Sequence, residues 1–222
     1  MGQPERAPRD TVIARFNAVS ECMAEHPLSP STEPPRRPTD RLFFALLPDA
    51  PAAAAIAELA NRLKAEHGLK GRPLATSRFH VTLHFFGDHV GLPHALVDGL
   101  AAAASALRFA PFDVVFDQAV SFPGRPRKRP FVLRGSEAGL AALMDFRRGL
   151  SEALVRQGLG ELVDDTFTPH VTLLYDGQLL PPQPVGPIVW RVNDFALVDS
   201  LIGQARHVPL ARWPLQGAST PS

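Results

Sequence analysis

Two stretches, Arg78-Phe-His-Val-Thr-Leu-His-Phe-Phe-Gly-Asp88 and Thr168-Pro-His-Val-Thr-Leu-Leu-Tyr-Asp-Gly177, decide how this sequence is interpreted. Each contains the tetrapeptide His-Val-Thr-Leu, which begins at His80 in the first copy and 90 residues later, at His170, in the second. In both copies an aromatic residue follows the histidine by five positions and a glycine follows it by seven. A duplicated segment of this kind predicts two related halves within one folded domain.

Side chains of a β-strand alternate between its two faces, so each copy separates its polar residues from its apolar ones. His80 and Thr82 share one face, and the intervening valine and the following leucine share the other. The same holds for His170 and Thr172. The apolar pairs can pack into a core, and the polar pairs then face solvent, a cleft or each other. Two such strands would present two imidazoles and two hydroxyls to one groove.

This set of side chains suits the cleavage of a phosphodiester. In-line attack on phosphorus needs a base that activates the nucleophile and an acid that protonates the leaving oxygen. Imidazole has an ordinary pKa of about 6.5, so one histidine can be neutral while the other is charged near neutral pH. Threonine hydroxyls can donate hydrogen bonds to the non-bridging phosphate oxygens. We therefore predict His80 and His170 as catalytic residues and Thr82 and Thr172 as phosphate-binding residues, with no metal and no cofactor.

Two other interpretations of the histidines are open. A lone histidine on an apolar strand is usually structural, but packing does not explain why both His and Thr recur on the polar face. A metal site is the second alternative, although two histidines without a third ligand make a poor one, unless Asp88 or Asp176 is recruited. If the alternation continues, His84 shares the strand face of His80, and we interpret it as a neighbour at the strand end.

Composition and length limit the class of protein. The chain has 222 residues, which fits one domain with two lobes better than two independent domains. A formal net charge of +1 rules out a protein that coats nucleic acid through its overall charge. The single cysteine, Cys22, excludes an internal disulfide framework and a multi-cysteine metal cluster. Without a long apolar segment or a secretory signal, we expect a monomeric cytoplasmic protein that does not contact membranes.

Residues 1–40 differ from the rest of the chain. The proline-rich run from Pro27 to Pro38 has little to bury and predicts an extended or disordered linker. Apolar residues at helical spacing between Asp10 and Met23 indicate a short helix before it, either docked or free. We predict a disordered or loosely docked extension over residues 1–40 and a folded domain over residues 41–215, with one His-x-Thr motif in each lobe.

Beyond residue 40, strands and helices are interleaved. The apolar spacing predicts helices over residues 50–67, 92–107 and 136–157. It predicts strands over residues 42–47, 79–86, 112–122, 130–133, 169–175, 187–201 and 206–213. Several of these strands form hairpin-like pairs. The pattern therefore predicts an α+β fold built on antiparallel sheet.

The loop Gly124-Arg-Pro-Arg-Lys-Arg-Pro130 concentrates four cations between two predicted strands. It is either a phosphate contact for the substrate or a solvated hairpin loop, and we take Arg127 and Arg129 as candidate substrate-binding residues. Tyr175 is the third candidate, because its hydroxyl needs a partner and its ring could stack on a base. Base stacking is also open for Phe79 and Phe85, although core packing is the simpler interpretation of all three aromatic residues.

The paired His-x-Thr motif resembles that of the two-histidine (2H) phosphoesterases, and within them the RNA 2′,3′-cyclic phosphodiesterase or 2′-5′ RNA ligase family. The resemblance covers about residues 40–213. It implies a bilobed α+β fold with two pseudo-symmetric lobes of antiparallel sheet, outer helices and a central cleft. Besides the two motifs, it rests on Arg41-Leu-Phe-Phe-Ala-Leu46, Phe86-Gly87, Ser121-Phe-Pro123, Arg129-Pro-Phe-Val132 and Phe167-Thr-Pro169.

The same resemblance implies hydrolysis of a 2′,3′-cyclic phosphate, at an RNA end or on a small nucleotide, to a 2′-phosphomonoester. Weak 2′-5′ ligation would be the reverse reaction. Carried over, His80 would protonate the leaving 3′ oxygen and His170 would activate water, although the near-symmetry makes the opposite assignment easy. Thr82 and Thr172 would bind the phosphate.

The substrate remains open at the level of sequence. After the second motif, Leu174-Tyr-Asp176 stands where the commoner bacterial pattern has a small residue and a basic one. Alternative substrates are ADP-ribose cyclic phosphate and 2′-5′ oligonucleotides. A nucleotide-binding module without turnover is the alternative from another class.

Overall fold

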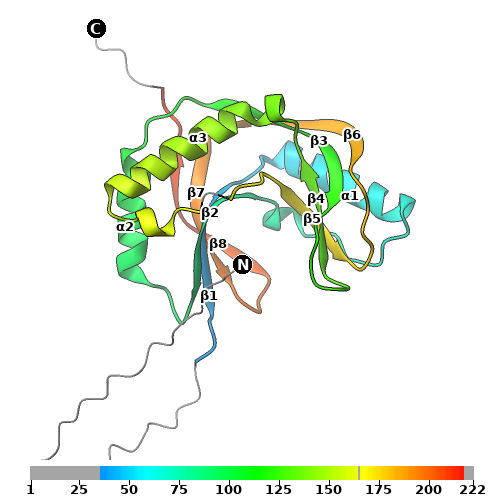
Figure 1. Ribbon diagram of the computed structural model, residues 1–222, viewed down its shortest axis with the longest axis horizontal. Coiled ribbons are helices and arrows are strands. Elements are labelled where there is room, and N and C mark those ends of the chain that lie inside the picture. Colours follow the sequence, from blue (N-terminus) through cyan, green and yellow to red (C-terminus); the bar gives the residue numbers. More distant parts are fainter. Residues whose placement is uncertain (1–35, 165, 218–222) are drawn as a thin grey trace, which may run out of the picture. The chain divides into compact units, whose positions relative to one another are not determined.

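Two antiparallel sheets of four strands each form the framework of the described part of the chain (Figure 1). The computed structural model describes residues 36–164 and 166–217, so the predicted helix and most of the predicted linker of the N-terminal extension lie outside the described residues. The first sheet has the order β2-β1-β7-β8 and the second has the order β5-β4-β3-β6. The strands are β1 (Asp40–Leu46), β2 (Val81–His89), β3 (Phe112–Ser121), β4 (Arg129–Arg134), β5 (Val171–Asp176), β6 (Gln183–Val192), β7 (Asp194–Leu201) and β8 (Arg206–Pro214).

Three α-helices connect these strands: α1 (Ala50–Glu66), α2 (His94–Ala106) and α3 (Glu137–Arg156). Two of them begin at side-chain caps, because the Asp49 carboxylate accepts from the Ala52 amide at 2.8 Å and the Ser136 hydroxyl accepts from Gly139 at 3.3 Å. Short 3₁₀ turns at Thr76–Arg78 and Gly160–Leu162 precede β2 and β5. No helix in the described ranges has the length and apolar character needed to cross a bilayer.

The two lobes are tied together by their helices. Helix α1 connects two strands of the first sheet, yet it packs against β5 and β6 of the second (Figure 1). Helix α3 connects two strands of the second sheet and contacts β3, but it also lies on the first sheet, where Phe146 packs edge-on against Phe195 of β7. Most buried apolar side chains of both sheets consequently belong to one hydrophobic core. A second, smaller cluster on the first sheet consists of Phe43, Ala45, Ala196 and Val198.

The α+β prediction is confirmed, but the single strand predicted over residues 187–201 is wrong. The chain there forms β6 in the second sheet and β7 in the first, with Asn193 between them. The Asn193 carbonyl accepts a hydrogen bond from the Leu215 amide at 2.7 Å, which stabilises the crossing point. Apolar alternation runs through both strands, and periodicity does not reveal which sheet a strand joins.

Each motif strand contains a β-bulge directly after its threonine. In the first lobe Thr82 pairs with Ala45 whereas His84 pairs with Phe44, so Leu83 is the extra residue. A bulge reverses the alternation of faces beyond it. The expected shared face of His80 and His84 is therefore wrong: His84 is 2% exposed, and its Nε2 lies 3.2 Å from the hydroxyl of Ser151 on α3.

The second lobe repeats this irregularity. Thr172 pairs with Val132 and Leu174 pairs with Phe131, which leaves Leu173 as the extra residue. The reversal brings the aromatic residue five positions after each histidine out of the core. Core packing is thus confirmed for Phe79 but wrong for Phe85, which is 51% exposed, and for Tyr175, which is 47% exposed.

Candidate functional site

His80 lies immediately before β2, on the face of the first sheet that also carries Thr82 and Phe43, which we call the inner face. Its Nδ1 is 2.8 Å from the Arg78 carbonyl oxygen, and its ring stacks on Phe43 with centroids 4.9 Å apart. A carbonyl only accepts hydrogen bonds, so in the neutral ring the proton is on Nδ1 and Nε2 carries the lone pair. The backbone and Phe43 together fix the orientation of this nitrogen.

His170 repeats the arrangement on the second sheet. Its Nδ1 is 2.7 Å from the Thr168 carbonyl oxygen, again two residues earlier in the chain. Its ring meets Phe122 edge-on with centroids 5.0 Å apart. The sequence duplication therefore reproduces a local geometry, and both imidazoles keep Nε2 for a proton transfer.

The electrostatic environment lowers the pKa of both imidazoles below 6.5. For His80 the largest cause is burial, partly opposed by the bond to the Arg78 carbonyl, and positive charge on His170 lowers its pKa further. For His170 burial is again the largest cause, the bond to the Thr168 carbonyl opposes it, and the nearby Arg134 lowers the pKa. The charge of His170 on the second sheet thus affects the protonation of His80 beside the first sheet, and with pKa values below 6.5 both imidazoles are mainly neutral at pH 7 before an anion binds.

Thr82 and Thr172 occupy equivalent places beside the histidines. Both are half-buried, and each pairs with a small or branched apolar residue of the central strand beside it, Ala45 and Val132 respectively. Within residues 36–164 and 166–217, neither threonine hydroxyl makes a hydrogen bond to another protein group. The hydroxyls can therefore donate to the oxygens of a bound anion.

The three substrate-binding candidates from sequence separate in the structure. Arg127 and Tyr175 line one cavity of about 520 Å³ together with Lys70 and Gln178. Arg127 lies in the left-handed region with φ of 68°, which is uncommon outside glycine, and it is exposed. Arg129, in contrast, donates to the Gly177 carbonyl and joins two strand ends.

Sequence reasoning missed a third histidine at this site. The ring centroid of His207, on β8, lies 5.0 Å from that of His80 and 5.6 Å from that of Phe43. Burial, followed by the charges of His80 and Arg78, lowers the pKa of His207 to about 4. Its imidazole is therefore neutral near pH 7 and packs beside His80. His207 pairs with Ser200 across the β7–β8 hairpin. The segment His207-Val-Pro-Leu210 matches the motif at three of four positions, with proline where each motif has threonine, and this partial match is the signal that could have found it.

The carboxylates considered as metal ligands have other partners. Asp88 forms a two-pronged ion pair with Arg41, with N–O distances of 2.6 and 2.7 Å. Asp176 accepts backbone amide bonds from Lys70, Gly71 and Gln178. In the described part of the chain, no group of three His, Cys, Asp or Glu side chains is arranged to hold a metal ion.

Comparison with known proteins connects this geometry to a family. The family model described as the 2′-5′ RNA ligase superfamily matches residues 47–201, which include both His-x-Thr motifs. The chain belongs to this superfamily. It is 30% identical over 181 residues to the RNA 2′,3′-cyclic phosphodiesterase of Escherichia coli K12, an alignment that covers 79% of this chain and 96% of the relative.

Solved structures of similar proteins share the fold. The apo LigT protein of E. coli matches with a TM-score of 0.60 and 28% identity, over 81% of this chain and 99% of that protein. A protein of Thermus thermophilus matches with a TM-score of 0.63 and 26% identity, over 81% of this chain and all of that protein. The E. coli protein has also been solved with 3′-AMP, with phosphate and with ATP.

Proposed function

We propose that the chain hydrolyses 2′,3′-cyclic phosphates at RNA or nucleotide ends to 2′-phosphomonoesters, without a metal ion. The observation that carries this proposal is the pair of imidazoles on two sheets, each with Nδ1 bonded to a carbonyl and Nε2 left for proton transfer. The 30% identity to the E. coli RNA 2′,3′-cyclic phosphodiesterase supports the substrate class. Reverse 2′-5′ ligation would be a weak side reaction.

The proposed reaction is one in-line displacement. His170 Nε2 accepts a proton from water as the water oxygen forms its bond to phosphorus. The bond from phosphorus to the 3′ oxygen breaks, and His80 donates the proton from its Nε2 to that oxygen. Thr82 and Thr172 donate hydrogen bonds to the non-bridging oxygens, whose negative charge persists through the transition state. One water is consumed, and a proton moves from His170 to His80 through solvent to restore the starting state.

A direct assay tests this function. The full chain is incubated with a short RNA that ends in a 2′,3′-cyclic phosphate, in EDTA, and the product is identified by ³¹P NMR. We expect a 2′-phosphomonoester and undiminished turnover in the chelator. A 3′-phosphomonoester, or activity restored only by added divalent metal, would contradict the proposal. Tight binding without turnover would instead identify a nucleotide-binding module.

The pH dependence follows from the lowered pKa values. One histidine must be neutral and the other protonated, so kcat/KM is expected to be bell-shaped, with both limbs below pH 6.5 because burial lowers both pKa values. The bound phosphate anion favours the imidazolium, so the kcat profile is expected to lie at higher pH than the kcat/KM profile. Initial rates from pH 4 to 9 at constant ionic strength measure both. A kcat/KM maximum above pH 7.5 would be incompatible with this site.

The same site could act on a related substrate. ADP-ribose cyclic phosphate carries a cyclic phosphodiester, and 2′-5′ oligonucleotides carry a linear one, which the two histidines could also cleave. The Lys70–Arg127–Tyr175 cavity supplies two cations and an exposed ring on the strand that follows His170, which favours a substrate with a nucleotide. Competition between these two compounds and the RNA 2′,3′-cyclic phosphate, measured as ratios of kcat/KM, decides the preferred substrate.

A further inference from the structure

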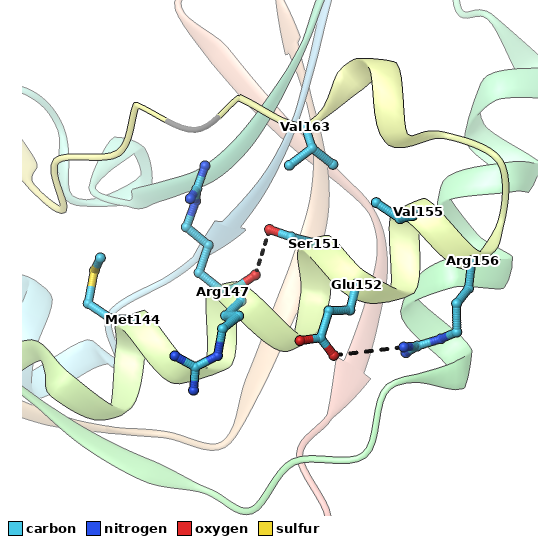
Figure 2. A pocket seen from close by; sticks show the side chains of 8 residues that line it. Met144, Arg147, Ser151, Glu152, Val155, Arg156 and Val163 are labelled. Carbon is cyan, nitrogen blue, oxygen red and sulfur yellow. Dashed lines mark hydrogen bonds and ion pairs between the residues drawn. The ribbon is translucent and has the colours of Figure 1, made fainter.

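Arg147, on α3, makes contacts that the proposed reaction does not use. It lies on the wall of a cavity of about 720 Å³ beside α3, together with Ser151 and Val163 (Figure 2). Its Nε donates to the Leu83 carbonyl oxygen at 3.1 Å, and its Nη2 donates to the Asp164 carbonyl oxygen. Its guanidinium carbon also lies 4.4 Å from the centroid of the Phe167 ring. One side chain therefore binds two backbone segments that are far apart in the sequence.

Each of these two segments adjoins one His-x-Thr motif in the sequence. Leu83 is the bulge residue of β2 and follows Thr82. Phe167 precedes Thr168, whose carbonyl holds Nδ1 of His170 at 2.7 Å. In the first lobe the guanidinium thus contacts Leu83, the residue that follows Thr82. In the second lobe it contacts Phe167, the residue that precedes Thr168.

We infer that Arg147 is a positioning residue that sets the spacing between the two His-x-Thr motifs. This inference rests on the proposed function, in which both histidines act on one phosphate. The effect of Arg147 on the reaction passes through the backbone of β2 and of the segment before β5, which its guanidinium contacts. It acts from α3, which packs on the outer side of the first sheet and contacts β3 of the second.

The guanidinium group is suited to this task. Its planar fork offers N–H donors in two fixed directions, while its face stacks on an aromatic ring. A lysine ammonium in its place carries the charge but has no fork and no planar face. Helix α3 also binds the first motif strand at a second point, through Ser151 and His84, which are 3.2 Å apart. Helix α3 is therefore held against β2 at two points, Arg147 and Ser151.

The experiment compares two adjacent arginines of α3. Arg147→Met keeps length and apolar bulk but removes both donors and the charge. Arg148→Met is the matched control, because Arg148 is 69% exposed and, among the described residues, pairs only with Asp145 on its own helix. We expect Arg147→Met to lower kcat by about 30-fold with KM within twofold, since a misplacement of about 1 Å can reduce a rate by 100-fold. Arg147→Lys should recover part of this loss, and Arg148→Met should stay within twofold of the natural protein.

NMR titration of His80 and His170 separates positioning from simple loss of stability. In the natural protein, charge on His170 lowers the pKa of His80. If the motifs move apart in folded Arg147→Met, this coupling weakens and the pKa of His80 rises, whereas both pKa values stay unchanged in Arg148→Met. Equal losses of kcat in the two variants, or unchanged histidine titrations in Arg147→Met, would overturn the inference. If the natural chain turns over no cyclic phosphate, the proposed function fails and the titrations alone decide the role of Arg147.

Discussion

Alanine in place of His170 is expected to lower kcat for cyclic-phosphate hydrolysis by about 10³- to 10⁴-fold, and alanine in place of His80 by about 10²- to 10⁴-fold. Each imidazole contributes one proton transfer to the same displacement. Because the two act as a unit, the double variant should be about as slow as the slower single variant rather than the product of both losses. Stopped-flow or discontinuous assays in EDTA give these rates.

Changing the leaving group of the substrate shows which histidine acts as the acid and which acts as the base. An aryl phosphodiester that releases 4-nitrophenolate needs no acid, because this leaving group departs as an anion. If His80 is the acid, His80→Ala should recover most of its activity on the aryl ester, while His170→Ala should remain slow on both substrates. The opposite pattern would exchange the two roles and leave the chemistry intact.

The control for these two variants is a histidine of β2 whose hydrogen bond is local. His89, at the end of β2, has its Nε2 3.0 Å from the Phe86 carbonyl oxygen and lies nine residues beyond His80. His89→Gln should keep kcat within twofold. Full activity in either His80→Ala or His170→Ala, with unchanged thermal unfolding, would contradict the paired mechanism.

The duplicated motif predicts a shared polar face for each histidine and its threonine, for a simple physical reason. A strand has a period of two, so a His-x-Thr segment between apolar residues can bury only one of its faces. The predicted alternation of faces fails at the residue that follows each threonine. Leu83 and Leu173 are as apolar as any strand residue, and nothing in their side chains shows that the partner strand skips them. Hence the buried position of His84 and the exposure of Phe85 were not predictable.

His207 beside His80, and Arg147 with its proposed positioning role, come from parts of the chain that only folding brings together. His207 belongs to the last hairpin, and Arg147 belongs to a helix on the outer side of the first sheet. In the sequence, His207 begins a His-Val-Pro-Leu segment that lacks the motif threonine, and Arg147 is one of three arginines of α3. Local periodicity predicts secondary structure, but the choice of sheet for β6 and β7 and the packing of α3 depend on long-range contacts. Residues that act across such contacts need the structure.

Asp176→Ala is expected to lower the free energy of unfolding by about 3 kcal/mol, because it leaves several buried amides without an acceptor. The Asp176 carboxylate is buried and accepts from Lys70 at 2.6 Å, Gly71 at 2.7 Å and Gln178 at 2.9 Å. It thereby fastens the loop after α1 to the end of β5. The approach is close: a Cβ on Gly71 would lie 2.1 Å from the Tyr175 carbonyl oxygen, so no other residue fits there.

The pH dependence distinguishes this carboxylate from a neutral acceptor. Burial alone would raise the pKa of Asp176, but the amide bonds from Gln178, Gly71 and Lys70 outweigh it and hold the pKa below 3.8. A lowered pKa stabilises the fold above the unfolded-state pKa, and this contribution disappears as the pH falls through the folded-state pKa. Urea unfolding of the natural chain and Asp176→Asn should therefore differ most near pH 7 and converge toward pH 3. Asp88→Asn, which breaks a partly exposed ion pair, is the control and should change stability by less than about 1 kcal/mol. A gap between natural chain and Asp176→Asn that is the same at pH 7 and pH 3 would show that the charge of Asp176 does not contribute.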